Sequence, residues 1–148
     1  MAKIEIRHAN IENIEDILKL EDGFGDEKYS RVLIEQSLKD ERLLNLIMFI
    51  DDVAIGYLSA SVMIDEGELL KIIVDKDYRG KKLATSLMVE LFNLLKEKGV
   101  RQIFLEVRKD NIPAKKLYEK LGFNKSHERK KYYSDGMDAE IYWCKLND

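Results

Sequence analysis

A short basic turn precedes a long apolar stripe near the middle of the chain. Arg79, Gly80, Lys81 and Lys82 form the turn, and the stripe begins at Leu83. The first turn of a helix presents unpaired backbone N–H groups and the positive end of the helix dipole, which together suit a phosphate or pyrophosphate. The alternative is an ordinary strand-to-helix turn with solvated basic side chains, because the segment matches neither the dinucleotide fingerprint nor the P-loop.

Closer to the C-terminus, the side chains of Glu106, Asn111 and Tyr118 are suited to proton transfer or ligand binding. A carboxylate such as Glu106 can accept a proton, and a phenol such as Tyr118 can donate one. Asn111 can contact a ligand or cap a helix. From the residues alone, the plainer interpretations are favoured: a solvated strand position for Glu106, a helix cap for Asn111 and a core aromatic for Tyr118. Strand alternation places Glu106 on the face opposite Leu105 and Val107.

The elements that must position these residues follow from apolar periodicity, eight glycines and a single proline. The order is a strand, two helices, three strands, a helix, a strand, a helix and two strands, which predicts an α/β fold. We expect a mixed sheet with an antiparallel first half and a central strand–helix–strand crossover. The predicted elements are a strand at 3–7, helices after Asn10 and Ser30 with a loop from Gly23 between them, strands at Leu43–Ile50 and Val53–Met63, a turn at Asp65-Glu66-Gly67, a strand at Glu68–Val74, a helix from Leu83 that ends just before Gly99, a strand at Gln102–Val107, a helix opened by Pro113 and ended by Gly122, and a closing hairpin of 123–133 with 138–146.

Two blocks resemble the GCN5-related N-acetyltransferase (GNAT) family. The segment from Arg79 to Ala84 is similar to the family's acyl-CoA motif, Gln/Arg-x-x-Gly-x-Gly/Ala, with Lys82 in place of the first glycine. The segment from Asn111 to Phe123 resembles the signature Asn-x-x-Ala-x-x-Leu-Tyr-x-x-Leu-Gly-Phe at all seven fixed positions. The resemblance covers nearly the whole chain and implies one acetyltransferase domain over 1–148, with a mostly antiparallel sheet, a β-α-β crossover and a splayed strand pair.

A narrower resemblance is to the bacterial ribosomal-protein alanine N-acetyltransferases, which acetylate the N-terminal alanine of a small-subunit ribosomal protein. The chain departs from that group at its Phe-Pro-Trp-Ser substrate loop, where Phe24-Gly25-Asp26 leads to Tyr29-Ser30. The matching positions are Leu105-Glu106-Val107-Arg108, Asn111, Tyr118, Arg129-Lys130-Lys131-Tyr132-Tyr133 and Asp138-Ala139.

The resemblance implies acetyl-CoA as co-substrate and assigns roles to particular residues. Glu106 becomes the general base, with His127 as a distant second choice, and Tyr118 becomes the acid that protonates the leaving thiolate. A phenol with a reference pKa near ~10 is protonated at neutral pH and can donate to a thiolate of pKa near ~8.5. The backbone N–H of Val74 is the expected oxyanion donor. The expected acetyl-CoA contacts are Ile72, Ile73, Val74, Arg79, Gly80, Lys81, Lys82, Leu83, Ala84, Thr85 and Asn111.

Composition excludes several other classes of protein. The chain has 148 residues, and its 25 basic and 28 acidic residues leave a net charge of −3, which argues against a nucleic-acid binder. The single cysteine, Cys144, cannot form an internal disulfide or a thiolate zinc site. The apolar stretches are far shorter than the ~18 residues of a membrane span. We therefore expect a cytoplasmic protein without a metal, membrane or nucleic-acid partner.

Three functions fit these observations. The first is acetylation of a protein N-terminal α-amine, with Glu66, Glu68 and the acidic loop at Asp26 and Glu27 attracting a cationic chain. The second uses the same residues on a small amine such as a polyamine or amino sugar. The third is an acyl-CoA sensor without turnover. Glu106 and Tyr118 together argue against a sensor, because binding alone requires neither a base nor an acid.

Overall fold

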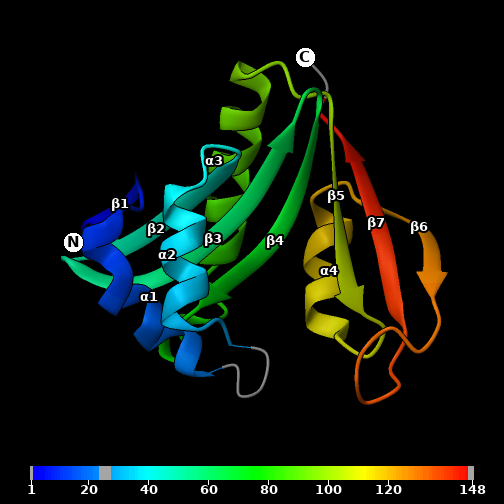
Figure 1. Cartoon of the computed structure of the whole chain (residues 1–148), viewed down its shortest axis with the longest axis horizontal. Coiled ribbons are helices and arrows are strands. Elements are labelled where there is room, and N and C mark those ends of the chain that lie inside the picture. The colour runs from blue at the N-terminus through cyan, green and yellow to red at the C-terminus, as the bar shows by residue number, and fades with distance from the viewer. Residues whose placement is uncertain (1, 24–27, 147–148) are drawn as a thin grey trace.

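The computed structural model describes residues 2–23 and 28–146, and within them one seven-stranded sheet has the order β1-β2-β3-β4-β5-β7-β6 (Figure 1). The predicted order of elements is confirmed, while residues 24–27 of the predicted loop lie outside the described ranges. The elements are β1 (Ile4–His8), η1 (Ile11–Asn13), α1 (Ile14–Glu21), α2 (Arg31–Lys39), β2 (Leu43–Ile50), β3 (Val53–Met63), β4 (Glu66–Val74), η3 (Lys76–Tyr78), α3 (Leu83–Glu97), β5 (Gln102–Arg108), α4 (Ile112–Lys120), β6 (Asn124–Arg129) and β7 (Ala139–Lys145).

Short polar side chains define where the first two helical segments begin. The Asn10 side chain accepts a hydrogen bond from the N–H of Glu12 in η1, which leads directly into α1. Ser30 caps α2 in the same way. These caps satisfy N–H groups that have no partner within the helix, so the predicted starts at Asn10 and Ser30 are confirmed.

Helices cover both faces of the sheet, and each face has its own apolar core. On one face, α3 contributes Leu87, Leu91 and Leu95 to a cluster that includes Ile103. On the other face, α1 and α2 bury residues such as Ile17 and Ile34. Figure 1 shows α1 and α2 in front of the sheet and α3 behind it. Over the described ranges, no helix combines the length and the apolar character needed to cross a bilayer.

The parallel pair β4 and β5 separates along its length, as predicted. The two strands pair only where Glu66–Leu69 lies beside 102–105. Beyond this stretch, β4 continues to Val74 and β5 to Arg108, and the two strands diverge (Figure 1). We call this divergent part the splay; it leaves one edge of each strand without the other as a partner.

Two predicted boundaries were wrong. The turn before β4 lies at Ile64 and Asp65, so the strand begins at Glu66 and includes Gly67. A Cβ at position 67 would lie 3.2 Å from Leu95 Cδ1, so this glycine allows α3 to pack closely and does not mark a turn. The second error concerns β6.

The strand β6 ends at Arg129, whereas the sequence predicted a strand running to Tyr133. Lys131 has a left-handed φ of 49°, and its N–H donates to Asp138 Oδ1 at 2.9 Å. This bond closes the β6–β7 connection early. Tyr132 and Tyr133 therefore lie in the connection and not in a strand.

Candidate active site

The edge of β4 at Val74 provides backbone groups that face the splay. The N–H of Asp75 donates to Ile55 O on β3 at 2.8 Å. Because neighbouring residues of a strand direct their N–H groups to opposite edges, the N–H of Val74 points away from β3, toward the β5 side. Its carbonyl on the same edge accepts a bond from Arg79 Nε at 3.1 Å. The pairing of β4 with β5 stops at Leu69, so this edge suits a ligand.

The turn between β4 and α3 combines two left-handed residues with an open helix start. Gly80 has a φ of 78°, and a Cβ there would meet no atom within 4 Å. Lys82, at the N-cap of the 15-residue helix α3, has a φ of 62° and makes no side-chain cap hydrogen bond. The first N–H groups of α3 are thus not capped by this side chain, and Arg79 and Lys81 add positive charge. These features fit a phosphate or pyrophosphate group.

The position of Lys82 explains the departure from the family motif. A left-handed conformation is freely available to glycine and costs other residues about 1–2 kcal/mol. Lys82 keeps the backbone conformation that a glycine would favour, so the substitution changes the side chain and leaves the turn intact. The neighbouring Leu83 is buried, whereas Ala84 and Thr85 are half-buried on the first turn of α3.

Glu106 points to the sheet face covered by α1 and α2, as strand alternation predicted. Its neighbours Leu105 and Val107 are buried on the opposite face. Arg129 Nη1, at the end of β6, lies 3.3 Å from Glu106 Oε1. A hydrogen bond to Glu106 is the main cause that raises the pKa of Tyr132, in the β6–β7 connection. The carboxylate is therefore held by two groups on a segment more than twenty residues away in the sequence.

Glu68 lies close to Glu106, but Glu66 does not. Glu68 is the strand partner of Phe104, one residue before the pairing of β4 with β5 ends. Burial raises the pKa of Glu68, the charge of Glu106 raises it further, and Arg129 lowers it. Glu66, at the other end of the pair, accepts a hydrogen bond from Gln102 at 3.2 Å. Of the acidic residues expected to attract a cationic chain, Glu68 is the one brought beside Glu106; Asp26 and Glu27 lie outside the described residues.

Tyr118 lies on the other side of the sheet, in α4. Its ring is buried in the α3-side cluster, with its centroid 5.7 Å from that of Phe123. Burial, followed by the charge of Tyr133, raises its pKa to about 12. The phenol is therefore protonated over the whole neutral range, although burial also makes it a weaker acid than a free tyrosine. Core packing and proton donation are both compatible with this position.

Asn111 begins α4 at the end of β5. Its Oδ1 accepts a hydrogen bond from the N–H of Ala114 at 3.2 Å, so the capping role is confirmed. This bond leaves the side-chain amide nitrogen to contact a ligand. Ile72 and Ile73 lie on opposite faces of β4, Ile73 in the cluster under α1 and Ile72 against the α3-side core.

The imidazole of His127 and the thiol of Cys144 have no surroundings that would make them reactive. His127 is exposed on β6, and its Nδ1 lies 2.9 Å from Ser126 Oγ. Cys144 is buried, and burial raises the pKa of its thiol, which makes it a poor nucleophile.

The sequence prediction missed a buried ion pair on the α1 side of the sheet. Glu21, at the end of α1, is 0% exposed, and its Oε1 accepts a bond from Lys71 Nζ at 2.8 Å. The same oxygen accepts the N–H of Tyr29 at 3.0 Å. A signal was present, because Glu21 follows Ile14 by seven residues and Ile17 by four, which places a charge on the apolar face of the helix.

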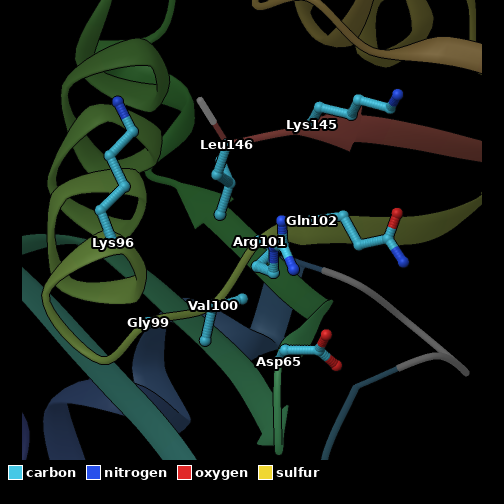
Figure 2. A pocket seen from close by; sticks show the side chains of 8 residues that line it. All are labelled: Asp65, Lys96, Gly99, Val100, Arg101, Gln102, Lys145 and Leu146. Atoms are coloured by element: carbon cyan, nitrogen blue, oxygen red, sulfur yellow. The ribbon is translucent and has the colours of Figure 1, made fainter. Parts of the chain in front are cut away.

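Neither of two cavities is lined by Glu106 or Tyr118. A cavity of about 500 Å³ lies where β4 and β5 begin, with Asp65, Arg101 and Gln102 around it (Figure 2). It adjoins the C-terminal end of α3, whose dipole disfavours anions, and neither Glu106 nor Tyr118 lines it. A smaller cavity of about 230 Å³ is lined by Tyr29, Leu70 and residues of α2. The candidate site is therefore defined by the splay and the turn before α3.

Comparison with known proteins gives consistent matches. The chain matches the model of the acetyltransferase (GNAT) family over residues 11–123. An N-alpha-acetyltransferase of Saccharolobus solfataricus is 31% identical over 92% of this chain and 89% of that protein. A ribosomal protein bS18-alanine N-acetyltransferase of Salmonella typhimurium is 40% identical over 68% of each chain. The crystal structure of the ribosomal-protein-S18-alanine N-acetyltransferase from Escherichia coli has a TM-score of 0.91 and 29% identity, covering 99% of this chain and 96% of that chain.

Proposed function

The chain belongs to the GNAT family and is an N-acetyltransferase, and on this basis we propose that it transfers the acetyl group of acetyl-CoA to a protein N-terminal α-amine, that of an alanine. One observation carries the proposal. Glu106 and Tyr118 lie on opposite faces of the sheet, and beyond Leu69 the edge of β4 that leads to Val74 no longer pairs with β5.

Acetyl-CoA is the co-substrate that this geometry supports. The pyrophosphate would bind the N–H groups of the Arg79–Thr85 turn, with charge from Arg79, Lys81 and Lys82. The Ile72–Val74 edge of β4 would pair with the pantetheine arm, and the amide nitrogen of Asn111 would face the same molecule. Acetyl-CoA supplies a thioester carbonyl and a thiol leaving group.

Residues of the chain would then stabilise one negative charge and transfer two protons. The N–H of Val74 would donate to the oxygen that becomes negative during transfer. Glu106 would take the proton of the attacking amine, directly or through water, and Tyr118 would return one to the departing sulfur. A group placed on each face of the sheet keeps the base near the acceptor and the acid near the sulfur.

The acceptor is inferred from chemistry and from the relatives. An α-amine has a reference pKa near ~7.7–8.0, so a useful fraction is neutral near pH 7.5, whereas lysine at ~10.4 is almost fully charged. Two of the similar proteins described above are named as acetyltransferases of a ribosomal-protein alanine, and the third as an N-alpha-acetyltransferase. A ribosomal protein with an N-terminal alanine is therefore the proposed substrate, and the cytoplasm is the expected compartment.

A small polyamine is the second candidate. The neighbouring carboxylates of Glu68 and Glu106 present negative charge to any cationic acceptor, peptide or not. Such attraction through exposed charges discriminates weakly between acceptors.

The proposal is tested by binding and by product analysis. Saturating acetyl-CoA should raise the melting temperature, because it binds only the folded protein. Incubation with acetyl-CoA and a peptide beginning Ala-Arg should release free thiol, and fragmentation of the product should locate the acetyl group on the N-terminal nitrogen. The Glu106→Gln variant should bind acetyl-CoA normally but react on the order of 10²-fold more slowly. An unchanged melting temperature, or acetylation elsewhere on the peptide, would contradict the proposal.

A further inference from the structure

Three residues from different elements form a closed set of contacts beside the splay. We call Glu21, Lys71 and Tyr29 the α1–β4 clamp. Glu21 Oε1 accepts bonds from both Lys71 Nζ and the Tyr29 N–H. Lys71 Nζ also lies 3.7 Å from the centre of the Tyr29 ring, a cation–π contact. The backbone and the ring of Tyr29 are therefore each held by one partner of the ion pair.

Stability alone does not account for this arrangement. Glu21 is fully buried, and the Lys71 side chain is only 10% exposed. Burying two charges costs desolvation energy, and replacing a buried ion pair by apolar residues of similar volume is often neutral or stabilising. The second oxygen of Glu21, Oε2, is buried and lacks a hydrogen-bond partner among the described residues, which adds a further cost.

The clamp holds Tyr29 over the sheet face on which Glu68 and the proposed base Glu106 lie. Leu69 packs in the α3-side cluster and Ile73 in the α1-side cluster, and the register of β4 shifts at Leu70. Glu68 and Lys71 therefore both face α1. The charge of Glu68 also raises the pKa of Tyr29, after burial and the charge of Glu21. Glu68 in turn feels the charge of Glu106. Tyr29, Glu68 and Glu106 thus follow one another across the α1 face of the sheet, from the start of α2 to β5. Tyr29 also lines the cavity of about 230 Å³ with Leu70 and Ser37.

We propose that the Glu21–Lys71 ion pair positions Tyr29 as a wall of the acceptor site, where its side chain contacts the first residues of the acceptor. Glu21 and Lys71 act through Tyr29 and do not touch the reacting atoms. This inference rests on the proposed acetylation of a peptide N-terminus. It predicts that loss of the clamp weakens acceptor binding, while acetyl-CoA binding, through the backbone edge of β4 and the turn before α3, is unaffected.

The test removes both charges together. In the double variant Glu21→Leu, Lys71→Met the pair is replaced by apolar side chains of similar length, so the melting temperature should stay near that of the wild type. The KM for an Ala-Arg peptide should rise about tenfold, because the wall is no longer fixed. The KM for acetyl-CoA and kcat should stay within about twofold of the wild-type values.

A matched control uses an exposed ion pair between α1 and α2. Arg31 Nη2 of α2 lies 2.6 Å from Glu15 Oε2 of α1, but both side chains are largely exposed. The variant Glu15→Gln, Arg31→Gln should leave all three parameters unchanged. Tyr29→Ala should raise the peptide KM as much as the double apolar variant does. Adding Tyr29→Ala to the Glu21→Leu, Lys71→Met variant should raise the peptide KM little further, because both changes remove the same wall of the acceptor site.

The outcomes separate this inference from the proposal on which it rests. A native peptide KM in a folded Glu21→Leu, Lys71→Met variant would show that the pair has only a structural role and would overturn the inference alone. An equal rise in the KM for acetyl-CoA would also overturn it, because the whole sheet would then be distorted. A wild-type protein that does not acetylate the peptide would overturn both.

Discussion

Arg129 Nη1 lies 3.3 Å from Glu106 Oε1, so a residue of β6 holds a carboxylate of β5 across the intervening strand β7. The Arg129 side chain is half exposed, and it also lies over the ring of Tyr132 at 5.6 Å. The end of β6 and the β6–β7 connection thus orient the proposed base, Glu106.

The first prediction concerns this contact. Arg129→Gln removes the charge that orients Glu106, and kcat/KM for the peptide should fall about fivefold, equivalent to ~1 kcal/mol, because a half-exposed ion pair is weak. The KM for acetyl-CoA should not change. Arg42→Gln is the matched control, because Arg42 also binds a carboxylate, that of Asp40, but on an exposed loop outside the candidate site. Equal losses in both variants would rule out a specific role for Arg129.

Tyr118→Phe tests the proposed acid. Removing one hydroxyl keeps the ring packed against Phe123, so the melting temperature and acetyl-CoA affinity should remain near the wild-type values. Turnover should fall on the order of 10²-fold when chemistry limits the rate. Single-turnover measurements separate chemistry from product release. Native turnover in this variant would assign Tyr118 to packing only.

A buried carboxylate outside the site predicts how stability depends on pH. Glu140 is nearly inaccessible and lies 3.2 Å from Lys115 Nζ and 3.3 Å from Lys125 Nζ. Burial raises its pKa, but the two lysines outweigh burial and the net pKa is lowered. The charged form thus stabilises the folded state above the unfolded-chain pKa of ~4.3, and this contribution is lost as pH falls through the lower, folded-state pKa.

Glu140→Gln should therefore lower the free energy of unfolding at pH 7 by about 1–3 kcal/mol, since two lysines lose their buried counter-charge. The difference from the wild type should shrink as pH falls below about 4. Urea unfolding at pH 7 and at low pH measures both values. Glu15→Gln, at a carboxylate that is 76% exposed and pairs with Arg31, should have a much smaller effect. A difference independent of pH would contradict the assignment.

At the left-handed N-cap of α3, a substitution should increase the stability of the protein. Lys82→Gly should raise the stability by about 0.5–1 kcal/mol, because glycine adopts a positive φ without strain. For a chain of this length, 1 kcal/mol corresponds to about 2–4 °C in melting temperature. Lys81→Gly, at a neighbouring residue with an ordinary φ, should lower stability instead. A destabilised Lys82→Gly variant would mean that the lysine side chain itself stabilises the turn.

Local patterns predicted much of the fold and part of the site. The alternation of β5 correctly placed Glu106 on the face opposite Leu105, and the apolar stripe of α3 predicted the buried leucines. The family motifs led to Tyr118 and to the turn before α3. These features depend on periods of two and 3.6 residues, which are visible in a single sequence.

These local patterns did not predict contacts between residues that are far apart in the sequence. Glu21 and Lys71 are 50 residues apart and meet only because α1 packs on β4. The role of Gly67 was misread for the same reason, since its need for a small residue comes from Leu95 on a later helix. The sequence does not distinguish a glycine at a turn from a strand glycine that lets a helix pack closely. Only the tertiary packing distinguishes the two.

The identity of the acceptor is tested most directly by comparing kcat/KM, with saturating acetyl-CoA, for three acceptors. These are a peptide beginning Ala-Arg, the same peptide with a blocked N-terminus, and spermidine. We expect the free peptide to have the largest kcat/KM and the blocked peptide to be inert, because only the free peptide offers an α-amine of suitable pKa. A larger kcat/KM for spermidine, or equal acetylation of the blocked peptide, would contradict N-terminal acetylation and favour a small-amine substrate.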